Sequence, residues 1–180
     1  MFYLAYGSNL HPARLQVRAP AARLLGKTVL TGYELHFHKR SVIDDSGKCS
    51  ISRADKSVHA AVYELSDRDK ALLDEVEGFG IGYRYEVLEI AEFGECFTYV
   101  ATDTHVDDSL RPYSWYKELV LIGCEALQFP KSYIAAVAMV ETLEDPDRQR
   151  HTEHMRIVHR ARHKITARRE GRHETPHRNS

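Results

Sequence analysis

The stretch SDRDKALLDEVEG (residues 66–78) decides the fold class, because it predicts a short helix set among sequences typical of β-strands. Ser66 can cap the first helical turn, and Asp69 follows three positions later, as in a capping box. Gly78 follows the last turn, where glycine adopts a left-handed backbone without strain. The sequence therefore predicts one helix bounded by Ser66 and Gly78.

Strand-like sequences flank this helix on both sides, with apolar and polar residues alternating as in half-buried strands. A first strand is expected in residues 2–6. Further strands are expected as a pair in residues 22–40, then in residues 49–52, 58–65, 83–93 and 96–103. Gly94 and Glu95 supply the turn between the last two.

Helical sequences dominate the later part of the chain. Residues 114–128 and 131–143 have helical period and composition, and Pro130 separates them. A short helix is also expected near the start, between Pro12 and Pro20. Strands thus come first and helices afterwards, which predicts an α+β domain with a mixed β-barrel or strongly curled sheet and flanking helices.

Charge divides the chain into a body and a tail. From Arg148 onward there are ten Lys or Arg against three Asp or Glu, whereas the preceding 147 residues hold fifteen against twenty-three. We expect one domain over residues 1–145, followed by a basic His- and Arg-rich extension over 146–180 that is helical and then disordered after about Ala167. Deletion beyond about Leu143 is expected to leave activity largely intact if this extension is peripheral.

The composition argues against several classes of partner. No apolar run approaches the length of a membrane span, and no secretory leader is recognisable, so the expected location is the cytoplasm.

The basic tail follows an acidic body, and it is expected to be a solvated face rather than a nucleic-acid site. Neither His151 with His154 nor His159 with His163 has a matched third ligand, so no metal site is expected. The cysteines predict reduced thiols; they are Cys49, Cys96 and Cys124.

Glu77 is the candidate chemical group of the short helix. Helical spacing places it on a stripe with Leu72, Leu73 and Val76, and so directs its carboxylate toward the core. Asp74 and Glu75 fall outside this stripe and are expected to be solvent-side charges. Burial would raise the pKa of Glu77 and make it a usable proton acceptor and donor near neutral pH. The alternative is a helix-end glutamate that points into water.

Two loops are candidates for a pocket lining. Gly7, Ser8 and Asn9 form a small polar turn directly after the first strand, and such a turn exposes backbone N–H groups that can receive an anion. The run EGFGIGYRY (residues 77–85) has three glycines and two tyrosines, so it can either line a pocket or act as a flexible connector.

Three stretches together resemble the gamma-glutamylcyclotransferase family: AYGSNL (residues 5–10), LDEVEGFGIGY (residues 73–83) and PYSWYKELVLIGCEALQFPKSY (residues 112–133). The resemblance covers most of residues 1–145. It implies an α+β fold with a mixed β-barrel and cleavage of a gamma-glutamyl amide to pyroglutamate and a free amine. It implies neither a metal nor an organic cofactor.

The resemblance also implies roles for particular residues. The substrate's α-amine attacks its own γ-carbonyl, and Glu77 matches the family's catalytic glutamate. Tyr116 matches a tyrosine that contacts the glutamyl moiety, and Tyr83 matches another, although Tyr85 is an equally placed candidate. The remaining implied substrate contacts come from the first strand and its loop: Tyr3, Leu4, Ala5, Tyr6, Gly7, Ser8 and Asn9.

A second function, of a non-enzymatic class, remains open. The chain could be a domain on the same scaffold that binds a small ligand without turnover. The carboxylate at position 77 favours the enzyme, since an apolar residue there would favour the binding domain. The amine leaving group, the pathway and the oligomeric state are left open by the sequence.

Overall fold

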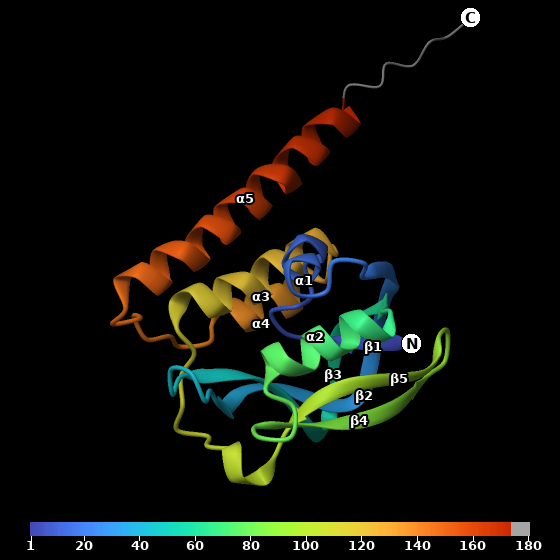
Figure 1. The fold of residues 1–180 in the computed structure, drawn as a ribbon. Coiled ribbons are helices and arrows are strands. Elements are labelled where there is room, and N and C mark those ends of the chain that lie inside the picture. Colours follow the sequence, from blue (N-terminus) through green and yellow to red (C-terminus); the bar gives the residue numbers. More distant parts are fainter. Residues whose placement is uncertain (174–180) are drawn as a thin grey trace, which may run out of the picture.

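The computed structural model describes residues 1–173, with side chains through residue 163, as an α+β fold (Figure 1). Its strands are β1 (Phe2–Ala5), β2 (Arg23–Arg40), β3 (Gly47–Glu64), β4 (Tyr83–Ile90) and β5 (Gly94–Ala101). Its helices are α1 (Pro12–Arg18), α2 (Asp67–Glu77), α3 (Ser114–Ala126), α4 (Lys131–Ala138) and α5 (Arg148–His173), with a short 3-10 turn η1 (Asp103–His105).

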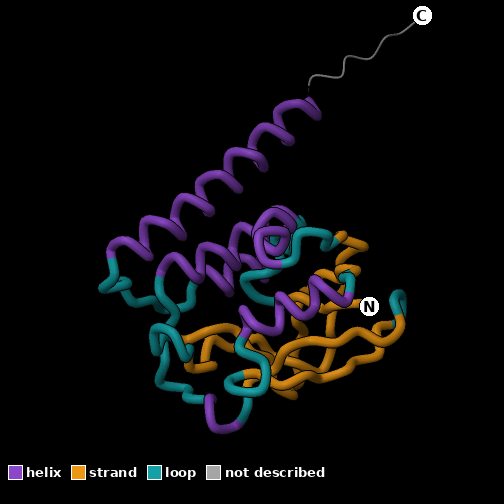
Figure 2. The backbone as a smooth tube through the Cα atoms, in the orientation of Figure 1, coloured by secondary structure: helices purple, strands orange, loops and turns teal. Residues whose placement is uncertain are grey.

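The five strands form one mixed sheet in the order β2-β3-β1-β5-β4. Strand β1 pairs antiparallel with β3 and parallel with β5, so the first strand of the chain lies at the centre. The α+β prediction is confirmed. The sheet is not closed, however, because β2 and β4 are its two edges within the described residues, so the barrel alternative is wrong. In Figure 2 the helices gather mainly on one side of this sheet.

The strand pair expected in residues 22–40 is a single long strand, β2, and the two strands expected between residues 49 and 65 are one strand, β3. These 18-residue strands form an antiparallel hairpin with register shifts at three places. One shift lies at Gly32, whose φ of +80° suits glycine. Bulges of this kind bend a strand without ending it, which is why the pattern resembled separate strands.

Helix α2 begins and ends where the sequence predicts. The Ser66 hydroxyl accepts a hydrogen bond from the Asp69 N–H at 3.1 Å, and Gly78 closes the helix with a φ of +68°. The predicted apolar stripe is wrong in part, because Leu72 and Val76 are exposed. The face toward the core instead follows the i, i+4 row through Asp69, Leu73 and Glu77.

The tail is part of the packed structure, at least through its first turns. Helix α5 packs against α3, and its Val158 and Ala161 belong to the buried core (Figure 1). This contradicts the expectation of a peripheral extension beyond Leu143. The helix extends to His173, past the predicted end near Ala167, and residues 174–180 lie outside the described residues. No helix in the described part of the chain is long and apolar enough to cross a membrane.

Candidate active site

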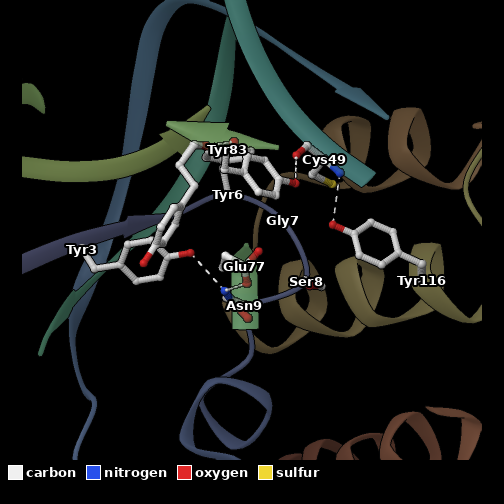
Figure 3. Close-up of a pocket in the computed structure, with 10 residues that line it drawn as sticks. Tyr3, Tyr6, Gly7, Ser8, Asn9, Cys49, Glu77, Tyr83 and Tyr116 are labelled. Atoms are coloured by element: carbon white, nitrogen blue, oxygen red, sulfur yellow. Dashed lines mark hydrogen bonds between the residues drawn. The ribbon is translucent and has the colours of Figure 1, made fainter. Parts of the chain in front are cut away.

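A small cavity of about 20 Å³ lies at the end of β1, where the loop of residues 6–10 meets the end of α2 (Figure 3). This volume holds about one or two water molecules. Its lining combines the first loop with residues from β1, β3, α2, β4, β5 and α3: Tyr3, Tyr6, Gly7, Ser8, Asn9, Cys49, Glu77, Tyr83, Tyr99 and Tyr116. Side chains up to 113 positions apart in the sequence therefore meet at this point.

The loop after β1 lines the cavity and contains backbone donors without a partner in the described residues. Within the described residues, the backbone N–H groups of Gly7, Ser8 and Asn9 form no hydrogen bond, whereas the Leu10 N–H closes the turn on the Gly7 carbonyl at 3.0 Å. Ser8 and Asn9 are nearly fully buried. Buried N–H groups without a partner are uncommon in proteins, and they are the groups that stabilise a carboxylate or an oxyanion.

The Glu77 carboxylate lies beside this loop and is held by two donors. Its Oε1 accepts hydrogen bonds from Asn9 Nδ2 at 3.0 Å and from Arg18 Nη1 at 2.6 Å. Only 16% of the Glu77 side chain is exposed. No hydrogen bond reaches Oε2 from any described residue. One carboxylate oxygen thus fixes the side chain, and the other remains available to accept a proton.

Asn9, Arg18 and Glu77 form a triangle of hydrogen bonds. Asn9 Nδ2 also donates to the Tyr3 hydroxyl at 3.1 Å, and Asn9 Oδ1 accepts from Arg18 Nη1 at 3.1 Å. The environment of Glu77 is therefore polar rather than the apolar one predicted from the sequence, and Arg18 was not among the predicted site residues. Arg18 is thus both a hydrogen-bond donor and an ion-pair partner of Glu77.

Two tyrosines hold the backbone of Cys49 at the far wall of the cavity (Figure 3). The Tyr83 hydroxyl donates to the Cys49 carbonyl at 2.7 Å, and the Tyr116 hydroxyl accepts from the Cys49 N–H at 3.1 Å. Burial raises the pKa of both phenols and of the Cys49 thiol. All three groups are therefore protonated at neutral pH, and Cys49 is not an activated nucleophile.

Tyr83, rather than Tyr85, lines the cavity. The Tyr85 hydroxyl donates to Asp74, and its ring stacks on Phe79 with the ring centres 3.9 Å apart. Asp74 also accepts a hydrogen bond from the cavity residue Tyr99 at 2.6 Å. The expectation that Asp74 is an ordinary solvent-side charge is therefore wrong, whereas Glu75 is exposed as expected.

Most of the predicted site residues come together in the cavity, with two exceptions. Leu4 and Ala5 are fully buried in the central strand and do not line it. Sequence reasoning missed Cys49, Tyr99 and Arg18. Each is brought to the site by a contact between distant segments, and nothing in the neighbouring residues marks it.

Gly7 allows the loop to approach β3 closely, and this gives a first prediction. A Cβ added at Gly7 would lie 2.8 Å from Cys49 Cβ and 3.3 Å from its Sγ. We expect Gly7→Ala to displace the loop, to lower the free energy of unfolding by ~1–3 kcal/mol and to reduce activity. Urea unfolding and steady-state kinetics measure the two effects. Gly80→Ala, which meets no atom within 4 Å but has a φ of +84°, separates backbone strain from this clash; equal stability and activity of Gly7→Ala and wild type would contradict the prediction.

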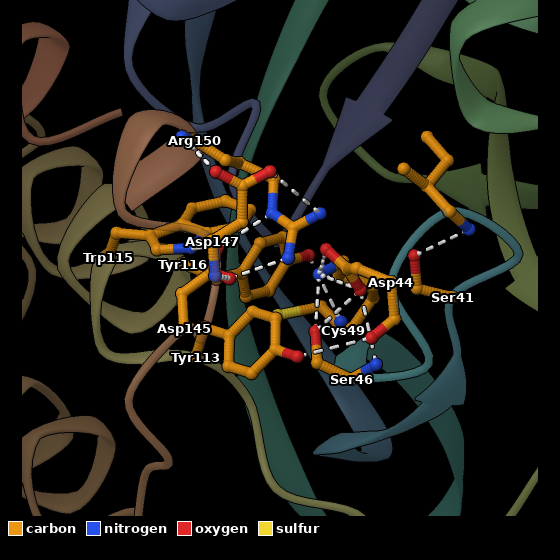
Figure 4. A network of polar contacts seen from close by, with 12 residues as sticks. Ser41, Asp44, Ser46, Cys49, Tyr113, Trp115, Tyr116, Asp145, Asp147 and Arg150 are labelled. Carbon is orange, nitrogen blue, oxygen red and sulfur yellow. Dashed lines mark hydrogen bonds and ion pairs between the residues drawn. The ribbon is translucent and has the colours of Figure 1, made fainter. Parts of the chain in front are cut away.

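A larger groove of about 380 Å³ adjoins the cavity and shares Ser8, Glu77, Tyr83 and Tyr116 with it. Part of its wall is the network in Figure 4, in which Arg150 pairs with Asp145 at 2.5 Å. The indole of Trp115 donates to the same carboxylate at 2.8 Å. Residues of α5 therefore contribute to this groove, although no site was expected in the tail.

Comparison with known proteins gives the family of the chain. Residues 3–118 match the family model described as gamma-glutamyl cyclotransferase, AIG2-like. A human protein named gamma-glutamylcyclotransferase is 27% identical over 150 residues, covering 77% of this chain and 78% of the human protein.

Solved structures with the same fold agree with this match. A structure named gamma-glutamyl cyclotransferase has a TM-score of 0.71 at 22% identity and covers 89% of this chain and 98% of its own. A crystal structure of an uncharacterized human protein has a TM-score of 0.71 at 23% identity and covers 87% of this chain and 96% of its own. The family match spans more than half of the sequence, and the chain belongs to the gamma-glutamyl cyclotransferase, AIG2-like family.

Proposed function

We propose that this protein is a gamma-glutamylcyclotransferase that converts a gamma-glutamyl amide to pyroglutamate and a free amine, without a cofactor. The observation that supports the proposal is the position of the Glu77 carboxylate. It lies at a small cavity, beside a loop whose backbone N–H groups are unpaired within the described residues. This pairing of a proton acceptor with oxyanion donors is what lactam formation requires.

Glu77 acts as the general base and then the general acid. The substrate's α-amine attacks its own γ-carbonyl carbon, so that a C–N bond forms and closes a five-membered ring. Glu77 accepts the proton from the attacking nitrogen and donates it to the leaving nitrogen as the original amide C–N bond breaks. Asn9 and Arg18 hold Oε1, and Oε2 exchanges the proton with the reacting nitrogens.

The loop of residues 7–9 stabilises the negative charge of the tetrahedral intermediate. Its backbone N–H groups are fixed before substrate binds, so little reorganisation is needed as the oxyanion develops. No side-chain nucleophile is required, because the substrate supplies its own amine. The thiol in the cavity, Cys49, is protonated, which agrees with a reaction in which the substrate's own amine is the nucleophile.

A panel of gamma-glutamyl amides tests the proposal, with pyroglutamate and free amine measured by mass spectrometry. The expected result is equal release of the two products. The matched control is the same amide with an acetylated α-amine, which cannot cyclise and is expected to stay intact. Release of glutamate instead of pyroglutamate would indicate hydrolysis and contradict the mechanism. A folded protein that binds the amides without turnover would favour the alternative, a small-ligand-binding domain.

A further inference from the structure

The groove beside Glu77 contains more positive than negative charge. Five Arg or Lys residues line it, against three Asp or Glu. Three of these cations are matched by carboxylates in the pairs Arg18–Glu77, Lys48–Asp44 and Arg150–Asp145. The remaining two, Arg14 and Lys39, form no ion pair and no side-chain hydrogen bond with any described residue. The third acidic residue of the lining, Glu75, is exposed and likewise unpaired within residues 1–163.

Arg14 is an enclosed guanidinium. It is 6% exposed, and its buried Nε has no hydrogen-bond partner. Burial, followed by the adjacent Arg18 guanidinium, lowers the pKa of Arg14 to about 9. The side chain therefore remains charged at neutral pH. A buried charge that lacks a partner is destabilising, and an anionic ligand would remove this penalty.

Lys39 is the second enclosed cation of the groove. It is 3% exposed, and its Nζ lies over the Tyr83 ring, 4.5 Å from the ring centre. Gly82 makes room for it, because an added Cβ there would lie 2.8 Å from Nζ. Burial lowers the pKa of Lys39. Two separate chain segments, α1 and the end of β2, thus place unpaired cations in the groove that adjoins the cavity.

The glutamyl part of the substrate does not account for two cations. The attacking α-amine is neutral, so the glutamyl part carries one negative charge, its α-carboxylate, and this charge can be received by those N–H groups of the first loop that do not contact the oxyanion. The remaining basic side chain of the groove lining, His154, is not a further cation, because burial and the neighbouring Arg14 lower its pKa to about 4. Two negative charges are therefore expected on the part of the substrate that occupies the groove, which is the leaving amine.

We propose that the leaving amine is an acidic amino acid, whose two carboxylates are held by Arg14 and Lys39. This inference rests on the proposed cyclotransferase function and specifies its substrate class. Guanidinium and ammonium groups bind carboxylates through charge-assisted hydrogen bonds, which are stronger than those to a neutral amide. The groove consequently favours an acidic leaving group over an amide of the same size.

Two substrates that differ by one charge test the inference. Gamma-glutamyl-glutamate and gamma-glutamyl-glutamine have the same length and differ in the charge of the leaving group. Because the groove favours the carboxylate over the amide, we expect kcat/KM to be about tenfold or more higher for gamma-glutamyl-glutamate. Lys39→Met and Arg14→Met each remove one cation. The variant that removes the partner of the side-chain carboxylate is expected to bring the ratio close to one. The other variant raises KM for both substrates. Lys56→Met, on an exposed part of β3, is the matched control and keeps the ratio.

The ratio is insensitive to a general loss of folded protein, because both substrates are measured on the same preparation. A wild-type ratio near one, or ratios unchanged in both variants, would overturn the inference while leaving the cyclotransferase function intact. Absence of pyroglutamate from every substrate would instead contradict the proposed function. In that case, equal binding of the two compounds by calorimetry would overturn the inference as well.

Discussion

The Glu77→Gln substitution is expected to lower kcat by about 10²–10⁴-fold, the range that general acid–base catalysis contributes. Gln keeps the size of the side chain and retains an oxygen that can accept the hydrogen bonds from Asn9 and Arg18. It cannot accept a proton from the attacking amine. Steady-state kinetics with pyroglutamate detection give kcat and KM, and KM is expected to change far less than kcat.

A matched control separates this effect from a change in overall charge. Glu95→Gln removes the same charge at an exposed position in β5 and is expected to keep wild-type kinetics. Thermal unfolding of Glu77→Gln shows whether the fold is retained. If a folded Glu77→Gln protein retained wild-type kcat, the assignment of Glu77 as acid and base would be wrong. A loss of binding rather than of kcat would assign it to substrate positioning.

The Val158→Asp substitution is expected to cause the largest loss of stability, ~3 kcal/mol or more. Val158 is fully buried on α5, in the core that this helix shares with α3. A carboxylate placed there has no ion-pair partner and must be desolvated or must push α5 away. For a chain of this size, such a loss lowers Tm by roughly 6–12 °C. Differential scanning calorimetry and urea unfolding measure it.

The adjacent residue provides the control for this prediction. His159 is exposed on the same turn of α5, so His159→Asp introduces the same side chain without burial. It is expected to change the free energy of unfolding by less than about 0.5 kcal/mol. Equal stability of the two variants would mean that α5 does not pack on the body in solution. Activity of Val158→Asp is also expected to fall, because Arg150 and His154 of α5 line the groove.

Local structure followed closely from the sequence. The Ser66 and Gly78 caps fix both ends of α2, and Pro130 separates α3 from α4, because each of these effects acts within one or two turns of the chain. The loop of residues 7–9 was also identifiable from its small polar residues. The resemblance of three ordered motifs to one family pointed to the same loop and to Glu77.

The environment of each site residue depended on contacts that the local pattern does not contain. Helical spacing predicted that Leu72 and Val76 face the core, but the face of the helix that is turned inward is the row through Leu73 and Glu77. Asp74, outside the predicted stripe, accepts a hydrogen bond from the hydroxyl of Tyr99, 25 positions away. The rotation of a helix about its axis is set by its neighbours, so a pattern of moderate amphipathicity does not specify it.

The sequence by itself determined the type of each element, the ends of the second helix and the identity of the loop that follows the first strand. Only the tertiary structure decided which side chains meet: Glu77 with Asn9 across 68 positions, and Tyr116 with the backbone of Cys49 across 67. The reason is that caps and turns are stabilised by atoms a few residues apart. A site assembled from distant segments depends instead on strand register and core packing, which form only when the whole chain is folded.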